Sequence, residues 1–208
     1  MNVIMLQDDV KIVEARLRKF EENTGCELLL VVAGSSDEYP AAPFRFGLVA
    51  SFLFNLVFSH YFEFQHAELW PIMFLATFLI FTFIGKYPAI RKFALSEWEV
   101  NRESKEKAIE LFHTQGTSRV THQVTAMIMV SVFERQIHVL VDKTLKEQIS
   151  QQELDDLVII MQTHFRAGNM ALGFTESIQS LEEKILKDFG GKVGNKHPGE
   201  LKDSILFL

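Results

Sequence analysis

The sequence predicts an α/β domain that is interrupted by a two-helix transmembrane hairpin. A continuous apolar run around Leu30 and two runs within residues 123–142 have the composition of β-strands. Amphipathic helical patterns precede and follow these runs, so a sheet of at least three strands with helices on its faces is expected. Between the first two strands, the stretch from Phe46 to Gly85 contains no Lys or Arg, although the chain of 208 residues carries 21.

The first segment of the domain, residues 1–43, is predicted to form a helix, a strand and a connector. Asp8 and Asp9 are expected to cap the helix, and Gly25 is expected to end it in a left-handed conformation. Residues 26–33 are apolar except for Glu27, which predicts a strand buried on both faces. The buried side of the helix is marked by apolar residues at helical spacing, Val10, Val13, Leu17 and Phe20.

The predicted hairpin, residues 44–87, contains two apolar runs, 46–62 and 70–85. Each run has about 16 or 17 residues, close to the lower limit for crossing a hydrocarbon core of roughly 30 Å. Both are apolar on every side, and a short chain has little with which to cover them as helices of a soluble core. For the polar residues Asn55 and His60, a helix-to-helix hydrogen bond or an interfacial position is favoured over a relay or ligand site.

The charges around the hairpin predict its orientation. The linker, residues 63–69, is short and acidic and has no Lys or Arg, whereas the outer flanks are basic. Since basic residues are retained on the cytoplasmic face, both segments of the domain are predicted to be cytoplasmic and the linker external. The flanking basic residues are Arg45, Lys86, Arg91 and Lys92.

The second segment of the domain, residues 88–191, follows a bend at Tyr87–Pro88. A helix is predicted over residues 96–113 and is expected to stop before Gly116. A β-hairpin with the turn FERQ is predicted over residues 123–142. The expected packing residues of the helix are Trp98, Ala108, Leu111 and Phe112.

Two further helices are predicted to close the domain. Ser150 and Glu153 form a capping box for the first of them, which is expected to end at residues 166–168. Two glycines, 190 and 191, end the second helix, whose apolar positions are Leu172, Ile178, Leu181, Ile185 and Leu186. The tail, residues 192–208, ends in ILFL, which is either a partner-binding strand or an added strand of the domain's own sheet.

The overall composition excludes several functions. A formal net charge of −6 and a pI of about 5.7 provide no basic surface for nucleic acid. The only cysteine, Cys26, excludes an internal disulfide and a cysteine-based metal cluster, and a structural thiol is expected. The N-terminus lacks a basic region followed by a long apolar core, so no cleaved signal peptide is expected.

Acidic residues at strand ends are the candidate ligands for a metal ion. Glu134 lies in the predicted β-turn, Asp142 follows the next strand, and Asp37 and Glu38 follow the first strand. Oxygen ligands on neighbouring loops suit a hard cation, Ca²⁺ or another divalent ion. The alternative is that these residues are ordinary solvated acids of turns.

No catalytic motif is found: the chain has no phosphate-binding glycine loop, GxSxG, HExxH or CxxC. Four histidines of the soluble part lack the spacing of a zinc site, and acidic residues 155–156 are expected to complement a helix dipole. The histidines are His113, His122, His138 and His164.

Several stretches resemble TPM-domain proteins, and specifically their bacterial branch with two membrane spans inserted in the domain. The strand-turn-strand VSVFERQIHVLVD, before the two closing helices, is the most specific of them. The others are TGCELLLVV, DEYPAAPFR, KAIELFHTQG, FRAGNMALGFTESIQSLEEKILKDFGG and GELKD.

This resemblance implies an αβα sandwich with a short mixed sheet, located at the inner (cytoplasmic) membrane of a bacterium. Relatives include a thylakoid-lumen protein credited with acid phosphatase activity and an auxiliary subunit of a neuronal receptor, and some bind calcium or other divalent cations. Membrane-bound members are often encoded beside LemA-type membrane proteins, which implies such a partner; a second copy of the chain is the alternative. Other relatives place the domain outside the cytoplasm, the alternative to the orientation given above.

Two classes of function follow. The first is a non-catalytic, membrane-anchored module that helps to assemble or stabilise another membrane protein. The second is a metal-dependent phosphohydrolase with Asp142 and Glu134 among its ligands. The missing nucleophile motif and the placement of the hairpin inside the domain favour the first.

Overall fold

The computed structural model describes residues 5–61, 67–117, 124–193 and 205–208. The chain divides into two compact units. The first combines Met1–Ser36 with Glu103–Leu208, and the second is Asp37–Arg102. The first unit is therefore built from two segments of sequence, and the second extends beyond residues 44–87, the predicted hairpin, at both ends.

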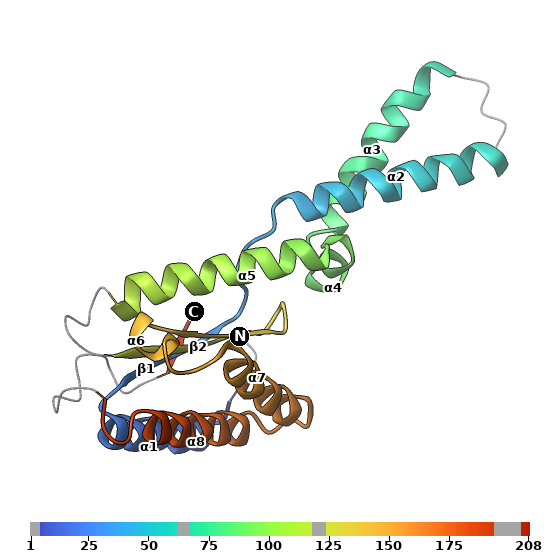
Figure 1. Ribbon diagram of the computed structural model, residues 1–208. Coiled ribbons are helices and arrows are strands. Elements are labelled where there is room, and N and C mark those ends of the chain that lie inside the picture. The colour runs from blue at the N-terminus through green and yellow to red at the C-terminus, as the bar shows by residue number, and fades with distance from the viewer. Residues whose placement is uncertain (1–4, 62–66, 118–123, 194–204) are drawn as a thin grey trace. The chain divides into compact units, whose positions relative to one another are not determined.

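The first unit is an α/β fold with one mixed sheet (Figure 1). The strand order is β3-β2-β1-β4, with β1 parallel to both β2 and β4 and β2 antiparallel to β3. The strands are β1 (Glu27–Ala33), β2 (Thr125–Ser131), β3 (Gln136–Val141) and β4 (Leu206–Phe207). The helices are α1 (Gln7–Thr24), α5 (Glu97–Leu111, in this unit from Glu103), a π-helical turn (Phe112–Thr117), α6 (Lys143–Lys146), α7 (Gln151–Arg166) and α8 (Met170–Asp188).

The predicted strands are confirmed, and the sheet settles the role of the apolar C-terminal end. β4 pairs with β1 in the domain's own sheet, with Val31 opposite Leu206. The last residue takes part, because the amide of Leu208 donates to the carbonyl of Val32 and its own carbonyl accepts from Gly34. Of the two alternatives for ILFL, the added strand is correct.

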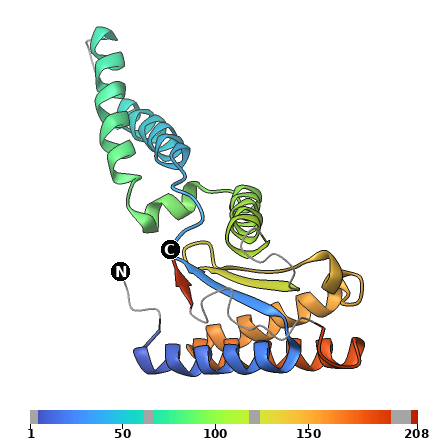
Figure 2. The same cartoon turned by 90° about the vertical axis from the view of Figure 1, so that its left-hand side faces the viewer.

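The central strands β1 and β2 are buried on both faces, which explains why β1 is apolar at every position except Glu27. One face packs against α1, α7 and α8, and the other against the C-terminal part of α5 (Figure 2). The first core includes Leu30, Phe20, Leu157, Phe174 and Ile178; the second includes Leu29, Val31, Ala108, Leu111 and Met129. This arrangement is the predicted αβα sandwich.

Several predicted helix ends are confirmed. Gly25 ends α1 with φ 71°, and Gly168 follows α7 with φ 82°. At the start of α7, Ser150 and Glu153 form the predicted capping box, each accepting from the other's backbone N–H. Asp8 and Asp9 do not cap α1: the capping position is Leu6, and the two acids lie in the first turn, where they complement the helix dipole.

Three details around α5 and α8 differ from the prediction. Trp98 and Leu172 are 67% and 45% exposed rather than packed. Trp98 instead lies against a guanidinium, with Arg102 Cζ 4.4 Å from the ring centroid. α5 ends at Leu111, but helical structure does not stop before Gly116, because a π-helical turn follows from Phe112 to Thr117.

The second unit contains two long apolar helices and a sharp bend. Its elements are α2 (Ala41–Tyr61), a 3-10 turn (Ala67–Leu69), α3 (Trp70–Ile84), α4 (Pro88–Arg91), a 3-10 turn (Lys92–Ala94) and the start of α5. By length and composition, α2 is able to cross a membrane; α3 with Pro88–Ala94, across a bend of 104°, passes the same test as a pair. Most of the predicted linker 63–69, His122 and most of the tail 192–208 lie outside the described residues.

Candidate functional site

Glu134 lies in the β2–β3 turn and is 7% exposed. Its Oε1 accepts from Ser35 Oγ at 3.1 Å and from the amide of Ser36 at 2.8 Å. Its Oε2 accepts from the hydroxyl of Ser131, which is fully buried. The carboxylate therefore ties the turn to the carboxyl ends of β1 and β2, and its oxygens are occupied by the chain itself.

Asp142 follows β3 and has a structural role of its own. Its Oδ1 accepts from the amide of Leu145 at 2.9 Å, which caps α6, and its Oδ2 accepts from the amide of Thr125 at 3.1 Å. Glu134 precedes β3 and Asp142 follows it, so the two are separated by the strand's length, roughly 20 Å. One ion therefore cannot be coordinated by both.

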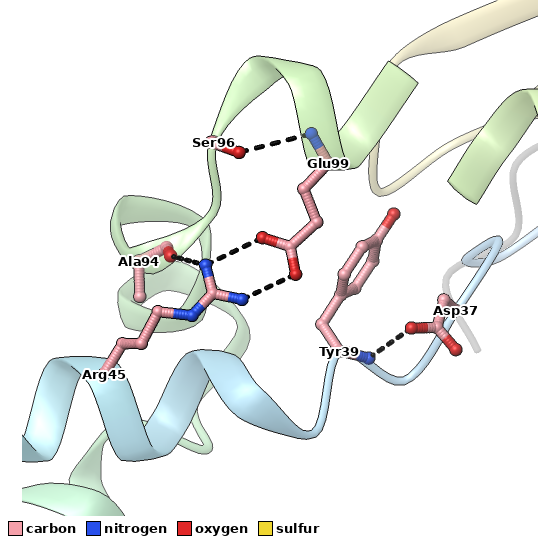
Figure 3. Close-up of polar contacts among 6 residues, drawn as sticks. All are labelled: Asp37, Tyr39, Arg45, Ala94, Ser96 and Glu99. Atoms are coloured by element: carbon pink, nitrogen blue, oxygen red, sulfur yellow. Dashed lines mark hydrogen bonds and ion pairs between the residues drawn. The ribbon is translucent and has the colours of Figure 1, made fainter. Parts of the chain in front are cut away.

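Asp37 belongs to the other unit, where its Oδ2 accepts from the amide of Tyr39 at 3.1 Å (Figure 3). Glu38, next to it, is exposed, and its carbonyl accepts from Arg91 Nη1 at 3.0 Å. Among the described residues, no group of three or more His, Cys, Asp and Glu side chains is arranged to hold a metal ion. The geometry thus does not assemble the predicted ligand set of Glu134, Asp142 and Asp37.

The histidines within the described residues are held by local partners. His138 Nε2 lies 2.9 Å from the hydroxyl of the fully buried Ser104, and burial, followed by the charge of Lys105, lowers the pKa of this imidazole. His164 Nε2 lies 2.7 Å from Glu176 Oε2 on the next helix. His113 is exposed beside the ring of the preceding residue, Phe112.

Cys26 is 1% exposed, and burial raises the pKa of its thiol to about 12. The thiol lies within hydrogen-bond reach of the carbonyl of Thr24. A thiol with such a high pKa stays protonated and unreactive at neutral pH.

A cavity of about 600 Å³ opens where the β2–β3 turn meets α7 and the start of α8. Sequence reasoning missed it, because its walls come from three separate stretches of the chain. The described residues that line it include two arginines, two glutamines and no Asp or Glu. They are Val130, Ser131, Val132, Arg135, Gln136, Ile137, Gln162, Phe165, Arg166 and Met170.

In the second unit, α2 and α3 place polar residues inside and apolar residues outside. Asn55 Nδ2 donates to Thr77 Oγ1 on the opposite helix at 2.9 Å and to the carbonyl of Ser51 at 2.8 Å, so the predicted helix-to-helix hydrogen bond is confirmed. Gly47 allows close approach, because a Cβ there would lie 2.1 Å from Thr82 Oγ1. His60 is exposed near the end of α2.

Arg45, near the start of α2, forms a bidentate ion pair with Glu99. Arg45 donates from Nη2 to Glu99 Oε1 at 2.6 Å and from Nη1 to Glu99 Oε2 at 2.8 Å (Figure 3). These hydrogen bonds from Arg45 lower the pKa of the Glu99 carboxyl. The amide of Glu99 in turn donates to Ser96 Oγ, so the carboxylate is fixed within the first turn of α5.

Comparison with known proteins shows a match to one domain family over part of the chain. Residues 96–184 match the family model of the TPM domain, which confirms the predicted resemblance over these residues. This stretch runs from the start of α5 into α8 and contains β2, β3 and the cavity.

A solved structure supports the fold. The NMR structure of the BA42 protein from the psychrophilic bacterium Bizionia argentinensis is similar, with a TM-score of 0.58 and 14% sequence identity. The similarity covers 98% of this chain and 95% of that chain. At this identity the likeness is one of fold. No curated protein sequence matches the chain.

Proposed function

We propose that this chain is a membrane-anchored TPM-domain protein of the bacterial branch with two inserted spans. In this proposal α2 and α3 cross the bilayer, and the TPM domain acts as a non-catalytic assembly or stability factor for another membrane protein. The observation that supports the membrane anchor is that the α2–α3 pair has polar or small residues on its inside and apolar residues on its outside, the reverse of a soluble helix pair.

The inner side of that pair is polar or small. Gly47, Ser51 and Asn55 are spaced by four residues along α2 and are buried. Small and hydrogen-bonding residues at such spacing are typical of contacts between membrane helices, which gain little from burying apolar surface against each other. Thr77 and Thr82 on α3 complete this interior.

The outer side of the pair is apolar and exposed. Large side chains on both helices are more than half exposed, which in water would form an apolar surface far larger than soluble monomers show. In a bilayer the same surface faces lipid at no cost. These side chains include Leu48, Phe52, Leu56, Ile72, Leu75, Leu79 and Phe83.

The end of the hairpin nearest the TPM domain in sequence has the composition of a membrane interface. After α3, which alone spans roughly 22 Å, the chain bends by 104° into Pro88–Ala94. This bent segment exposes Phe93 (89%) and contains Arg91 and Lys92, as interfacial anchors do. Because the far linker has no Lys or Arg, we place the TPM domain in the cytoplasm; the opposite orientation is the alternative.

The assembly role is supported by how the candidate acids are used. Glu134 binds three hydrogen-bond donors of the domain, and Asp142 caps α6. Both acids maintain the fold, which leaves the metal-dependent phosphohydrolase without the ligands it was predicted to use. The proposed partner is a membrane protein, of the LemA type by the resemblance, or a second copy of the chain.

Sidedness can be tested by labelling single cysteines. In a Cys26→Ser background, Glu147→Cys places an exposed thiol in the TPM domain and Glu68→Cys places one beside the hairpin linker. A membrane-impermeant maleimide is expected to label Glu68→Cys in intact spheroplasts and Glu147→Cys only after lysis. The reverse pattern would overturn the orientation, and release of the protein by alkaline carbonate would overturn the membrane anchor.

The assembly role can be tested by purification from native membranes in mild detergent, followed by mass spectrometry. The tag belongs at the N-terminus, because Leu206–Phe207 pair with β1 at the other end. We expect a stoichiometric membrane partner that is lost when Phe52, on the exposed side of α2, is replaced by serine. The matched control Ile159→Ser, in the TPM domain, is expected to retain the partner; both side chains are about 60% exposed. Protein that copurifies with nothing, and remains monomeric, would contradict the assembly role.

A further inference from the structure

The cavity beside the β2–β3 turn concentrates positive charge in a protein that is negative overall. The chain has a formal net charge of −6, yet the described residues around the cavity include Arg135 and Arg166 and no acid. Within the described part of the chain, neither guanidinium forms a hydrogen bond or an ion pair. Both are therefore available to a ligand, and arginines favour a phosphate or a carboxylate because their planar donors match its oxygens.

Arg135 is held in place by the structure of its turn. Its backbone has φ 57°, a conformation that costs a non-glycine residue free energy and persists only where the surroundings fix it. The surroundings do so through the preceding residue: Glu134 is bound to Ser35, Ser36 and Ser131. Glu134 is thus a positioning residue for Arg135.

Part of the cavity wall is apolar and closely packed. Phe165 packs against Phe174 with ring centroids 5.2 Å apart, and a Cβ at Gly173 would lie only 2.6 Å from the Phe165 ring. Met170 and Ile137 extend this apolar surface, and the amides of Gln136 and Gln162 provide neutral hydrogen-bonding groups. A cavity of about 600 Å³ with this mixture of groups has the size and composition of a small-molecule site.

We propose that this cavity binds a small molecule that joins a phosphate or carboxylate group to an apolar body. Arg135 and Arg166 bind the anionic group, and Phe165, Met170 and Ile137 contact the apolar part. The site lies within one compact unit and within the TPM-matched residues. It depends neither on the membrane anchor nor on the assembly role.

The test is isothermal titration calorimetry of the full-length protein in detergent with phenyl phosphate, phenylacetate and inorganic phosphate. Phenyl phosphate or phenylacetate is expected to bind roughly tenfold more tightly than inorganic phosphate, because only these probes also contact the apolar wall. Whether phenyl phosphate or phenylacetate binds more tightly distinguishes the two anionic groups. Absence of saturable binding by both aromatic probes at about 10 mM would overturn the site.

Variants separate the cavity from general charge effects. Arg135→Asn and Arg166→Gln are each expected to weaken binding of the aromatic probes roughly tenfold. Asn tolerates the left-handed backbone, so Arg135→Asn is not expected to destabilise the fold. The matched control, Arg18→Gln on α1, removes the same charge outside the cavity and is expected to leave affinity unchanged.

Unaltered affinity in both cavity variants would overturn the proposal. Release of phenol from phenyl phosphate, abolished in the two cavity variants, would support the site while overturning the non-catalytic role proposed above. The two proposals therefore fail independently.

Discussion

Replacing Glu134 by alanine tests whether this acid serves the fold or a metal ion. The substitution removes one carboxylate that accepts from Ser35, Ser36 and Ser131, at a position only 7% exposed. A hydrogen bond to a charged group contributes about 1.5–3 kcal/mol, and neighbouring bonds are not additive. Since Ser36 Oγ and Ser131 Oγ already lie 2.9 Å apart and can satisfy each other, we expect a total loss of about 3 kcal/mol.

The assay is thermal unfolding of the purified full-length protein in detergent, followed by circular dichroism. A loss of about 3 kcal/mol corresponds to a fall in Tm of roughly 6–12 °C for a chain of this size. The control Glu147→Ala removes an exposed acid at the end of α6 and is expected to change stability by less than about 0.5 kcal/mol.

The response to Ca²⁺ distinguishes a structural carboxylate from a metal ligand at Glu134. A metal site at Glu134 predicts that Ca²⁺ stabilises the wild type, by about 2.7 kcal/mol at a hundredfold excess over Kd, and does not stabilise Glu134→Ala. A structural carboxylate predicts the same small response to Ca²⁺ in both proteins. Calcium stabilisation confined to the wild type, or an unchanged Tm in Glu134→Ala, would show that the structural account of Glu134 is wrong.

Three further substitutions test other parts of the structure. Burial keeps the pKa of His138 below its ordinary value of 6.5, so the unfolded state takes up the proton first and stability falls as the pH drops through that value. His138→Gln should therefore flatten the dependence of unfolding free energy on pH in this range. An unchanged slope would contradict this prediction. Gly47→Ala places a Cβ 2.1 Å from Thr82 Oγ1 and should cost the hairpin about 1–3 kcal/mol in mixed-micelle unfolding with SDS, whereas neutrality would argue against close packing. Ser150→Ala removes half of the capping box and should cost about 1 kcal/mol by the same thermal assay, with Ser150→Asp as the variant expected to retain stability.

The elements set by local patterns were predictable from sequence. The β-hairpin, the left-handed Gly25 and the capping box at Ser150 each follow from a few neighbouring residues. Asp142 also carried a local signal, because it precedes the short helix Lys143–Lys146 as a capping residue does, yet its position at a strand end suggested a ligand. Both interpretations fit the sequence, and the hydrogen bond to Leu145 decides between them.

The features that depend on distant contacts were not predictable. Two of the three serines that bind Glu134, Ser35 and Ser36, follow β1, and they reach it only because β1 and β2 pair in parallel, with Ala33 opposite Ser131. The cavity likewise joins the β2–β3 turn to α7 and α8, which no motif connects. Trp98 was expected to pack with the other apolar residues of its helix, but it lies in the first turn of α5 and is exposed.

The parallel pairing of β1 and β2 also has a consequence for biosynthesis. β1 emerges from the ribosome before the hairpin, and its neighbour β2 emerges only after both α2 and α3 have been made. The packing of α1 is completed later still, because its packing partner α8 is synthesised near the end of the chain. Contacts so distant in sequence form slowly, and until they form the apolar β1 has neither of its neighbours in the sheet. If α2 and α3 insert into a membrane as proposed, their insertion precedes completion of the sheet, and a substitution that delays insertion should cause misfolding of a unit that it never touches.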